Sequence, residues 1–142
     1  MGATIVAVAR TWKGTPYRHQ ASRKGLGCDC LGLIRGVWRE LAGAEPERLP
    51  PYTPSWAEDK GQETMRDAAL RHMREVPVDR LEPGDVLLFR VRRGRPAKHA
   101  AIAVDRQHII HAYGGHAVEE TPIPAEWRDC IAYAFAFPWV PA

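Results

Sequence analysis

Cys30 is the residue of this sequence whose type and setting best fit nucleophilic chemistry. It begins a segment in which apolar residues recur at helical spacing, at Ile34, Val37 and Leu41, while charged residues take the opposite face. Asp29, directly before it, is a residue type that caps the N-terminus of a helix. Unpaired N–H groups and the helix dipole favour negative charge at this end, and the thiolate is the nucleophilic form of cysteine. The sequence therefore predicts that Cys30 begins a core helix and acts as a nucleophile.

A nucleophilic cysteine needs a base and a group that orients the base, and two histidines are spaced for these roles. His99 begins one apolar run and His111 ends the next. We expect the turn between the runs to pair Val104 with His108. The side chains of His99 and His111 then share one face of a sheet and come within reach of each other, whereas His108 takes the opposite face. His99 is the predicted base, and His111 is predicted to bind the far nitrogen of His99 and fix its tautomer.

The sequence also offers groups that could stabilise the thiolate, the imidazolium and the oxyanion of such a reaction. Near neutral pH the cysteine–histidine pair is expected to rest as thiolate and imidazolium, with the pKa of the Cys30 thiol lowered from about 8.5 to below about 7. Backbone N–H groups at the helix start are candidate oxyanion donors, and Tyr17, from the preceding loop, can add a hydroxyl donor. Each residue also has a structural reading, because buried cysteines and histidines often only pack, Tyr17 can pack, and Asp29 can serve only as a cap.

Helical spacing and strand alternation of the apolar residues predict the helices and strands that position these residues. Helical spacing predicts three helices, at residues 3–13, 30–41 and about 62–74. Apolar and alternating runs predict five strands, at residues 86–91, 99–104, 108–112, 116–119 and 131–137. Residues 15–27 are predicted to be irregular, and the proline-rich residues 43–55 to form a loop. The order indicates one α+β domain over residues 1–142, with N-terminal helices packed on a C-terminal antiparallel sheet of about five strands.

The composition sets limits on partners and compartments. A net charge of +3 over 142 residues is too weak to indicate nucleic-acid binding. No apolar run is long enough to span a membrane, and residues 3–9 are too short, without a preceding positive charge, for an export signal. Three cysteines, two of them one residue apart, do not form a disulfide framework. We expect reduced thiols in a protein that is made in the cytoplasm without a signal peptide and does not insert into membranes.

Five motifs, in this order, resemble those of the NlpC-type papain-like cell-wall cysteine peptidases. They lie at residues 15–17, 27–33, 83–86, 99–102 and 110–112. The resemblance implies a papain-like fold in which Cys30 is the nucleophile, His99 the base and His111 the third, polar member. It implies cleavage of peptidoglycan stem peptides, typically next to γ-linked D-glutamate and diaminopimelate. No metal or other cofactor is expected.

Two departures from the family pattern concern the surroundings of Cys30. Leu31 stands where serine is usual, and because only the backbone N–H of that position bears on the oxyanion, no loss of activity is expected. Arg18, His19 and Gln20 replace a pair of glycines that often follows the family tyrosine. This second departure bears on the shape of the substrate groove.

The resemblance is closest to the stand-alone peptidases of phage tails and phage-like gene transfer agents. It implies tail hub or tip proteins as partners, a place in the particle, and action in the periplasm of the target cell, where the enzyme opens the wall during entry. The missing export signal agrees with such a route, because a tail protein assembles in the cytoplasm.

Two other classes of function remain open at this point. Cys28, Cys30, His99 and His111 form a possible zinc ligand set, although a Cys-x-Cys pair lacks the usual ligand spacing of two to four residues. The other class is a structural tail component that keeps the peptidase fold without turnover. The intact cysteine–histidine–histidine set favours the enzyme over both.

Overall fold

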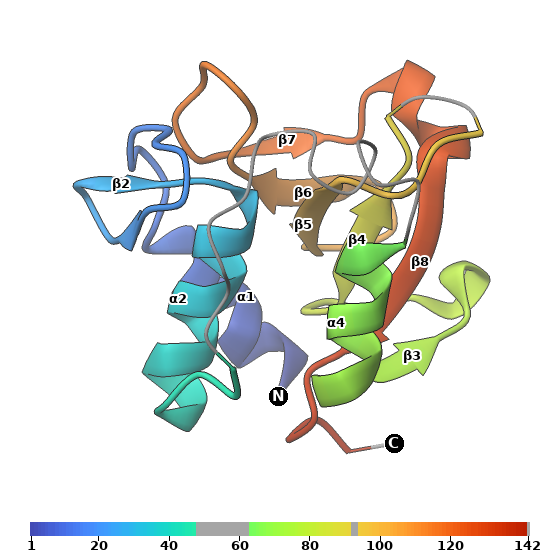
Figure 1. The fold of residues 1–142 in the computed structure, drawn as a ribbon, viewed down its shortest axis with the longest axis horizontal. Helices are drawn as coiled ribbons and strands as arrows, with labels where there is room; N and C mark the ends of the chain where they lie inside the picture. Colours follow the sequence, from blue (N-terminus) through green and yellow to red (C-terminus); the bar gives the residue numbers. More distant parts are fainter. Residues whose placement is uncertain (48–62, 92–93, 142) are drawn as a thin grey trace.

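The computed structural model describes residues 1–47, 63–91 and 94–141, in which helices pack on an antiparallel sheet (Figure 1). The described α-helices are α1 (Gly2–Arg10), α2 (Cys30–Ala42) and α4 (Thr64–His72). The sheet has six strands in the order β3-β8-β4-β5-β6-β7: β3 (Arg74–Val76), β4 (Val86–Phe89), β5 (His99–Ala103), β6 (His108–His111), β7 (Glu119–Pro122) and β8 (Ile131–Ala136). A separate hairpin of β1 (Ser22–Arg23) and β2 (Gly27–Cys28) precedes α2. The predicted α+β architecture is confirmed.

Helix α2 begins at Cys30 as predicted, and its buried stripe faces the sheet. Leu33 and Val37 are fully buried, and each contributes about 1.5–3 kcal/mol by leaving water. Gly36 allows α1 to approach closely, because a Cβ atom there would lie 2.0 Å from the ring of Trp12. Gly43 follows the last turn with φ 88°, a conformation that favours glycine. Tight packing of α1 and α2 thus holds the first turn of α2 in place.

The register between β5 and β6 is the one predicted from the sequence. Ile102 pairs with Ile110 and Ala103 pairs with Ile109. The turn that sets this register is closed by Asp105, whose Oδ1 accepts hydrogen bonds from the N–H groups of Gln107 and His108 at 2.7 and 2.8 Å. This register places the side chains of His99 and His111 on one face of the sheet.

Several elements differ in extent from the predictions. The first helix ends at Arg10 rather than residue 13, and the third covers Thr64–His72, within the predicted span. The expected strand at residues 116–119 lies instead at Glu119–Pro122, because residues 113–116 form a turn in which the N–H of His116 binds the carbonyl of Tyr113. Most of the predicted proline-rich loop, residues 48–55, lies outside the described residues.

The sheet is larger than predicted, and it separates two apolar layers. Three-residue β3 adds a sixth strand, and the predicted irregular segment contains the β1–β2 hairpin; both are too short to show a period in the sequence. One layer, with Leu33, Ile102 and Phe135, lies between the sheet and α1 and α2. The other, with Leu87 and Ile109, covers the opposite face of the sheet. Within the described residues, no helix combines the length and hydropathy needed to cross a bilayer.

Candidate active site

The site lies where the N-terminus of α2 meets the start of β5. Cys30, the first residue of α2, is half-buried, so part of its side chain remains open to solvent. Backbone hydrogen bonding from Leu31 and Ala100 reaches its sulfur. Ala100 is the second residue of β5 and directly follows His99. The structure therefore brings the predicted nucleophile to the strand that carries the predicted base.

Asp29 holds the chain before α2 against the first turn of the helix. Its side chain is only 3% exposed. Oδ1 accepts a hydrogen bond from the N–H of Gly32 and Oδ2 accepts one from the N–H of Gln20, both at 2.7 Å. A Cβ atom at Gly32 would lie 1.9 Å from the carbonyl oxygen of Ala21, so this close approach requires glycine. Asp29 is thus a cap that also fixes the loop next to Cys30.

Replacing Asp29 by alanine is expected to lower the free energy of unfolding by about 1–3 kcal/mol, because two N–H donors lose their acceptor. Asp29→Asn keeps one oxygen for the N–H of Gly32. We therefore expect it to lower the free energy of unfolding by about half as much as Asp29→Ala does. Urea unfolding followed by circular dichroism measures both. Equal midpoints for wild type and Asp29→Ala would contradict the capping role.

Tyr17 lies with Asp29 and Cys30 on the same side of the site. Its backbone forms a parallel bridge with Cys28, and its ring packs against the core layer below α2. Burial raises the pKa of its phenol, with smaller contributions from the nearby Cys30, Asp29 and Cys28. The structure thus groups Tyr17 with the predicted nucleophile, and its role as an oxyanion donor stays a prediction.

The two predicted histidines are in direct contact. His99 Nε2 lies 2.8 Å from His111 Nδ1, and both side chains are only 4% exposed. The contact uses Nε2 of His99 and leaves its Nδ1 for another partner. The sequence-derived geometry of the pair is therefore observed, while the catalytic role of each histidine stays a prediction.

Three aromatic rings around the histidine pair were missed by the sequence analysis. Phe89 is the strand partner of His99, and Tyr113 lies two residues after His111, so strand register and the period of two would have placed both. Trp127 comes from η2 (Ala125–Cys130), a 3-10 helix without a sequence signal. These rings supply most of the apolar surroundings of the pair.

Burial makes both predicted charges unfavourable. Desolvation, followed by the negative charge of Asp29, raises the pKa of the Cys30 thiol to about 12. Desolvation, followed by His111 and Lys98, lowers the pKa of His99 to about 3. Both shifts disfavour the expected thiolate–imidazolium resting pair, because burial of two charges costs more than the helix N-terminus contributes. Their directions favour an uncharged thiol and an uncharged imidazole at neutral pH.

The lowered pKa of His99 should make the free energy of unfolding depend on pH. Between pH 6.5 and pH 3 the unfolded chain binds a proton at His99 that the folded chain does not, so the free energy of unfolding falls as the pH falls. From pH 6.5 to pH 5, where ordinary carboxyl groups remain ionised, the expected loss is about 1–2 kcal/mol. Urea unfolding of wild type and His99→Gln measures it, and parallel curves for the two proteins would contradict the assignment.

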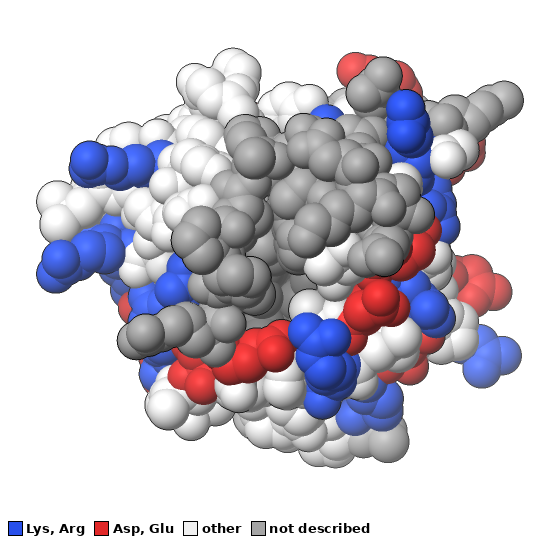
Figure 2. All heavy atoms as spheres, viewed as in Figure 1, with Lys and Arg blue, Asp and Glu red and all other residues white. Residues whose placement is uncertain are grey.

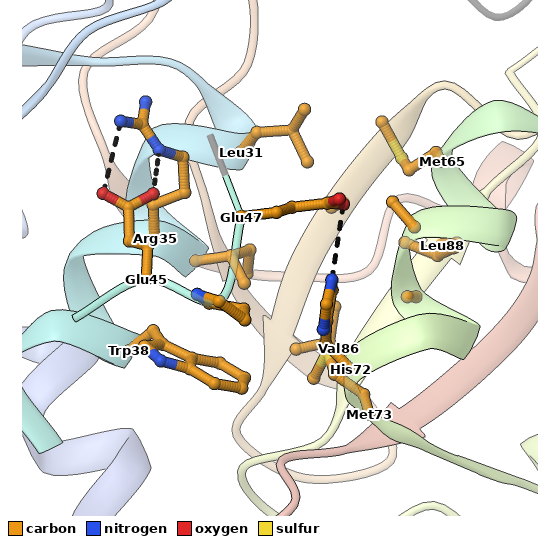
Figure 3. A pocket seen from close by; sticks show the side chains of 15 residues that line it. Leu31, Arg35, Trp38, Glu45, Glu47, Met65, His72, Met73, Val86 and Leu88 are labelled. Atoms are coloured by element: carbon orange, nitrogen blue, oxygen red, sulfur yellow. Dashed lines mark hydrogen bonds and ion pairs between the residues drawn. The ribbon is translucent and has the colours of Figure 1, made fainter. Parts of the chain in front are cut away.

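An apolar pocket of about 120 Å³ lies between α2 and α4, on the core side of the first turn of α2 (Figure 3). Leu31 and Ala100 line the end nearest Cys30, and Leu88 on β4 lines its floor. Two polar contacts lie at its rim, an ion pair of Arg35 with Glu45 at 2.6 Å and an approach of His72 Nε2 to Glu47 Oε1 at 3.5 Å. Leu31, which replaces the usual serine, therefore packs among apolar groups.

Leu31→Ser is expected to lower the free energy of unfolding by about 1–2 kcal/mol, because a hydroxyl replaces apolar surface beside the pocket. Leu31→Met keeps the volume, and its expected cost is below about 1 kcal/mol. Thermal and urea unfolding of the two variants give the comparison. A serine variant as stable as wild type would show that Leu31 does not contribute to this packing.

Basic residues lie near the site, whereas a metal ligand set is missing from the described part of the chain. Figure 2 shows Lys and Arg side chains at the left edge of the view, where Figure 1 places the β1–β2 hairpin. The segment around this hairpin contains Arg18, Arg23 and Lys24. In residues 1–47, 63–91 and 94–141, no group of three or more His, Cys, Asp or Glu side chains is arranged to hold a metal ion. The zinc alternative therefore has no ligand cluster there.

Known proteins resemble this chain in sequence and in fold. "Probable endopeptidase NlpC" of Escherichia coli (strain K12) is 27% identical over 103 residues, which cover 72% of this chain and 56% of that protein. The chain thus spans about half the length of that relative. The crystal structure of the NlpC/p60 domain of the peptidoglycan hydrolase SagA superposes with a TM-score of 0.67 and 25% identity, over 96% of this chain and 99% of that chain.

A third relative shows that the fold also occurs without catalysis. RipD from Mycobacterium tuberculosis, described as a non-catalytic NlpC/p60 domain protein adapted to peptidoglycan binding, superposes with a TM-score of 0.56 and 16% identity, over 94% of this chain and 95% of that chain. The structural likenesses confirm the predicted papain-like α+β fold. The model of the NlpC/P60 family matches residues 14–131. Since that match covers most of the sequence, the chain belongs to the NlpC/P60 family.

Proposed function

We propose that this protein is a cysteine peptidase that hydrolyses peptide bonds in peptidoglycan stems. The observation that carries the proposal is the 2.8 Å contact between His99 Nε2 and His111 Nδ1, beside the helix start that presents Cys30. A base oriented by a second polar group next to a thiol at a helix N-terminus is the arrangement that acyl transfer requires. Family membership supports peptidoglycan as the substrate.

The neutral resting state assigns a specific role to each ring nitrogen. In the proposed tautomer, His99 donates its Nε2–H to Nδ1 of His111 across their 2.8 Å contact, and Nδ1 of His99 accepts the proton of the thiol. As the sulfur of Cys30 attacks the carbonyl carbon, the thiol proton passes to His99, so no thiolate has to exist beforehand. The C–N bond then breaks as His99 protonates the leaving amine, and water hydrolyses the resulting thioester with His99 again as base.

The oxyanion of the tetrahedral intermediate forms at the N-terminus of α2. The N–H of Cys30 is its proposed donor, with the Tyr17 hydroxyl as a second. Asp29 does not contact substrate in this scheme; it holds the first turn of α2 and the loop through Gln20 in place.

The substrate bond and the setting are further parts of the proposal. The bond next to γ-linked D-glutamate and diaminopimelate follows from the motif resemblance, and the basic hairpin segment suits the carboxylates of such a peptide. The same resemblance supports a place in a phage-like tail with hub or tip proteins as partners, synthesis in the cytoplasm, and action in the periplasm of a target cell. Co-purification with tail particles would support this setting, and free protein in the periplasm of intact cells that release no particles would contradict it.

Digestion of purified Gram-negative sacculi tests the activity. Wild type should release soluble fragments whose masses identify the bond that is cut, and Cys30→Ala should release none. Fragments from both proteins would contradict a cysteine mechanism. Absence of fragments from both, on sacculi that a known endopeptidase digests, would contradict the proposed activity.

A non-catalytic wall-binding protein is the second candidate. The non-catalytic RipD shares the fold, and burial keeps both Cys30 and His99 uncharged at rest. In that case the wild type would sediment with sacculi and release no fragments, and Cys30→Ala would bind equally well. Turnover by wild type excludes this candidate.

A further inference from the structure

Trp127 contacts every ring of the aromatic group that surrounds the histidine pair. Its ring centroid lies 5.4 Å from His99, 5.6 Å from His111, 4.9 Å from Tyr113 and 5.4 Å from Phe89. The residue belongs to η2, which connects β7 to β8, whereas the histidines lie on β5 and β6. Trp127 thus contacts both histidines from an element outside β5 and β6.

The geometry of these contacts restricts how the imidazoles can turn. The interplanar angles of Trp127 are 64° with His99 and 89° with His111, which are edge-to-face arrangements. Such contacts stabilise a ring pair by about 0.5–1.5 kcal/mol beyond burial, and they weaken when either ring rotates. The hydrogen bond between the two histidines depends on both ring planes, so rotation of either ring would break it.

Trp127 also contributes to the burial of the pair. Both imidazoles are 4% exposed, whereas Tyr113, on the outer side of the group, is 37% exposed. Removal of the indole would leave space for water beside the two imidazoles on the side of η2, because the ring contacts both of them. A hydrated pair would lose both its fixed orientation and its low polarity.

We propose that Trp127 is a positioning residue, which fixes the ring planes of His99 and His111 and shields their shared hydrogen bond from water. The consequence for catalysis rests on the proposed function. The fixed orientation of the two histidine rings does not rest on the proposed function, because it is a property of the fold.

Charged groups around His99 and His111 also influence how these two histidines titrate. His99 lies beside Lys98 and next to His111, whose own pKa responds to Glu119 on β7 and to His116. Backbone hydrogen bonding from Ala100, the residue directly after His99, reaches the sulfur of Cys30. Three charged residues share η2 with Trp127, namely Glu126, Arg128 and Asp129. Substitutions at Trp127 alone keep all these charges, so a changed titration reports on hydration and orientation.

Nitrogen-15 NMR of labelled histidines tests the positioning role directly. Wild type, Trp127→Phe and Trp127→Ala are compared, and His99→Gln and His111→Asn assign the two signals among the six histidines. In wild type, the ring of His99 should show one neutral tautomer without titration between pH 5 and pH 8, and the ring of His111 should titrate below the pH of a free imidazole. In Trp127→Ala the tautomers should mix, and His99 should titrate in this range. Trp127→Phe should stay close to wild type.

Kinetics on a soluble stem peptide supply the second readout. Trp127→Ala should lower kcat by about 10- to 100-fold with KM within about threefold, and its activity should fall more steeply below pH 6.5. Trp139→Ala is the matched control, since it removes an indole from the separate cluster with Trp38 and Phe137. This control should leave the histidine spectra unchanged. It also reports the loss of stability that removal of a half-buried tryptophan causes by itself.

The outcomes separate the two proposals. Wild-type histidine spectra in Trp127→Ala would overturn the positioning role, whether or not the enzyme is active. Altered histidine spectra in Trp127→Ala, with a wild type that does not digest sacculi, would keep the positioning role and reject the peptidase. If Trp127→Ala does not fold, Trp127→Leu takes its place, and wild-type histidine spectra in Trp127→Leu would overturn the role equally.

Discussion

Cys30→Ala should reduce peptide hydrolysis by about 10,000-fold or more, to the background rate, because in the proposed mechanism the sulfur forms the covalent intermediate. The fold should persist, since Cys30 lies at the end of α2, half-exposed, and alanine is the best helix former. Release of stem-peptide fragments measures the activity, and circular dichroism with urea unfolding measures the fold. Equal hydrolysis by wild type and variant would reject Cys30 as nucleophile.

The other two cysteines provide the controls for this experiment. Cys130 is half-buried on η2 and donates a weak hydrogen bond to the carbonyl of Glu126 at 3.4 Å, so Cys130→Ser should leave turnover within about twofold. Cys28 is fully buried, and burial raises the pKa of its thiol to about 12, so it should not react with alkylating reagents in the folded protein. Because Cys30 is also a neutral thiol at rest, alkylation of the free enzyme should be slow at pH 7 and accelerate with rising pH.

Substitutions of the histidine pair should differ in size because the two rings have different tasks. His99→Ala removes the base, and the expected loss in kcat is about 1,000-fold or more. His111→Ala removes only the acceptor that orients His99, so the expected loss is about 10- to 100-fold. Steady-state kinetics on a soluble stem peptide from pH 5 to pH 9 measure both variants.

Rescue by asparagine distinguishes orientation from mere packing at position 111. The side-chain oxygen of an asparagine can accept the Nε2–H of His99, so His111→Asn should recover a substantial part of the activity that His111→Ala loses. The double variant Cys30→Ala with His99→Ala should be no worse than Cys30→Ala alone, because the two residues act as a unit. Full activity of His111→Ala with a wild-type pH profile would remove His111 from the mechanism.

Local sequence signals located the candidate site because short-range interactions position its main residues. Asp29 caps α2 through Gly32, three residues away, and Asp105 closes the turn that sets the β5–β6 register. Both are interactions within a few residues, which single-sequence patterns can represent. The positions of Cys30, His99 and His111 followed from them.

The charge state of the site was not predictable in the same way. The pKa values of Cys30 and His99 both depend on burial, and the rings against His99 include Phe89 and Trp127, which are distant in sequence. No periodic pattern marks Trp127, because it lies in a six-residue 3-10 helix. The extra strand β3 was missed for a related reason, since three residues are too few to establish alternation.

The place of β8 in the sheet has a consequence for how the protein folds. Although it follows all other strands in sequence, β8 lies between β3 and β4 and pairs with both. The sheet therefore stays split until the last strand arrives, and the four buried residues of β4 present an open, apolar edge to the solvent. Such non-local pairing raises the contact order, and we expect it to slow folding. Because η2 immediately precedes β8, insertion of this strand also delivers Trp127 to the histidines. We therefore expect pairing of β8 and placement of Trp127 beside the two histidines to occur together.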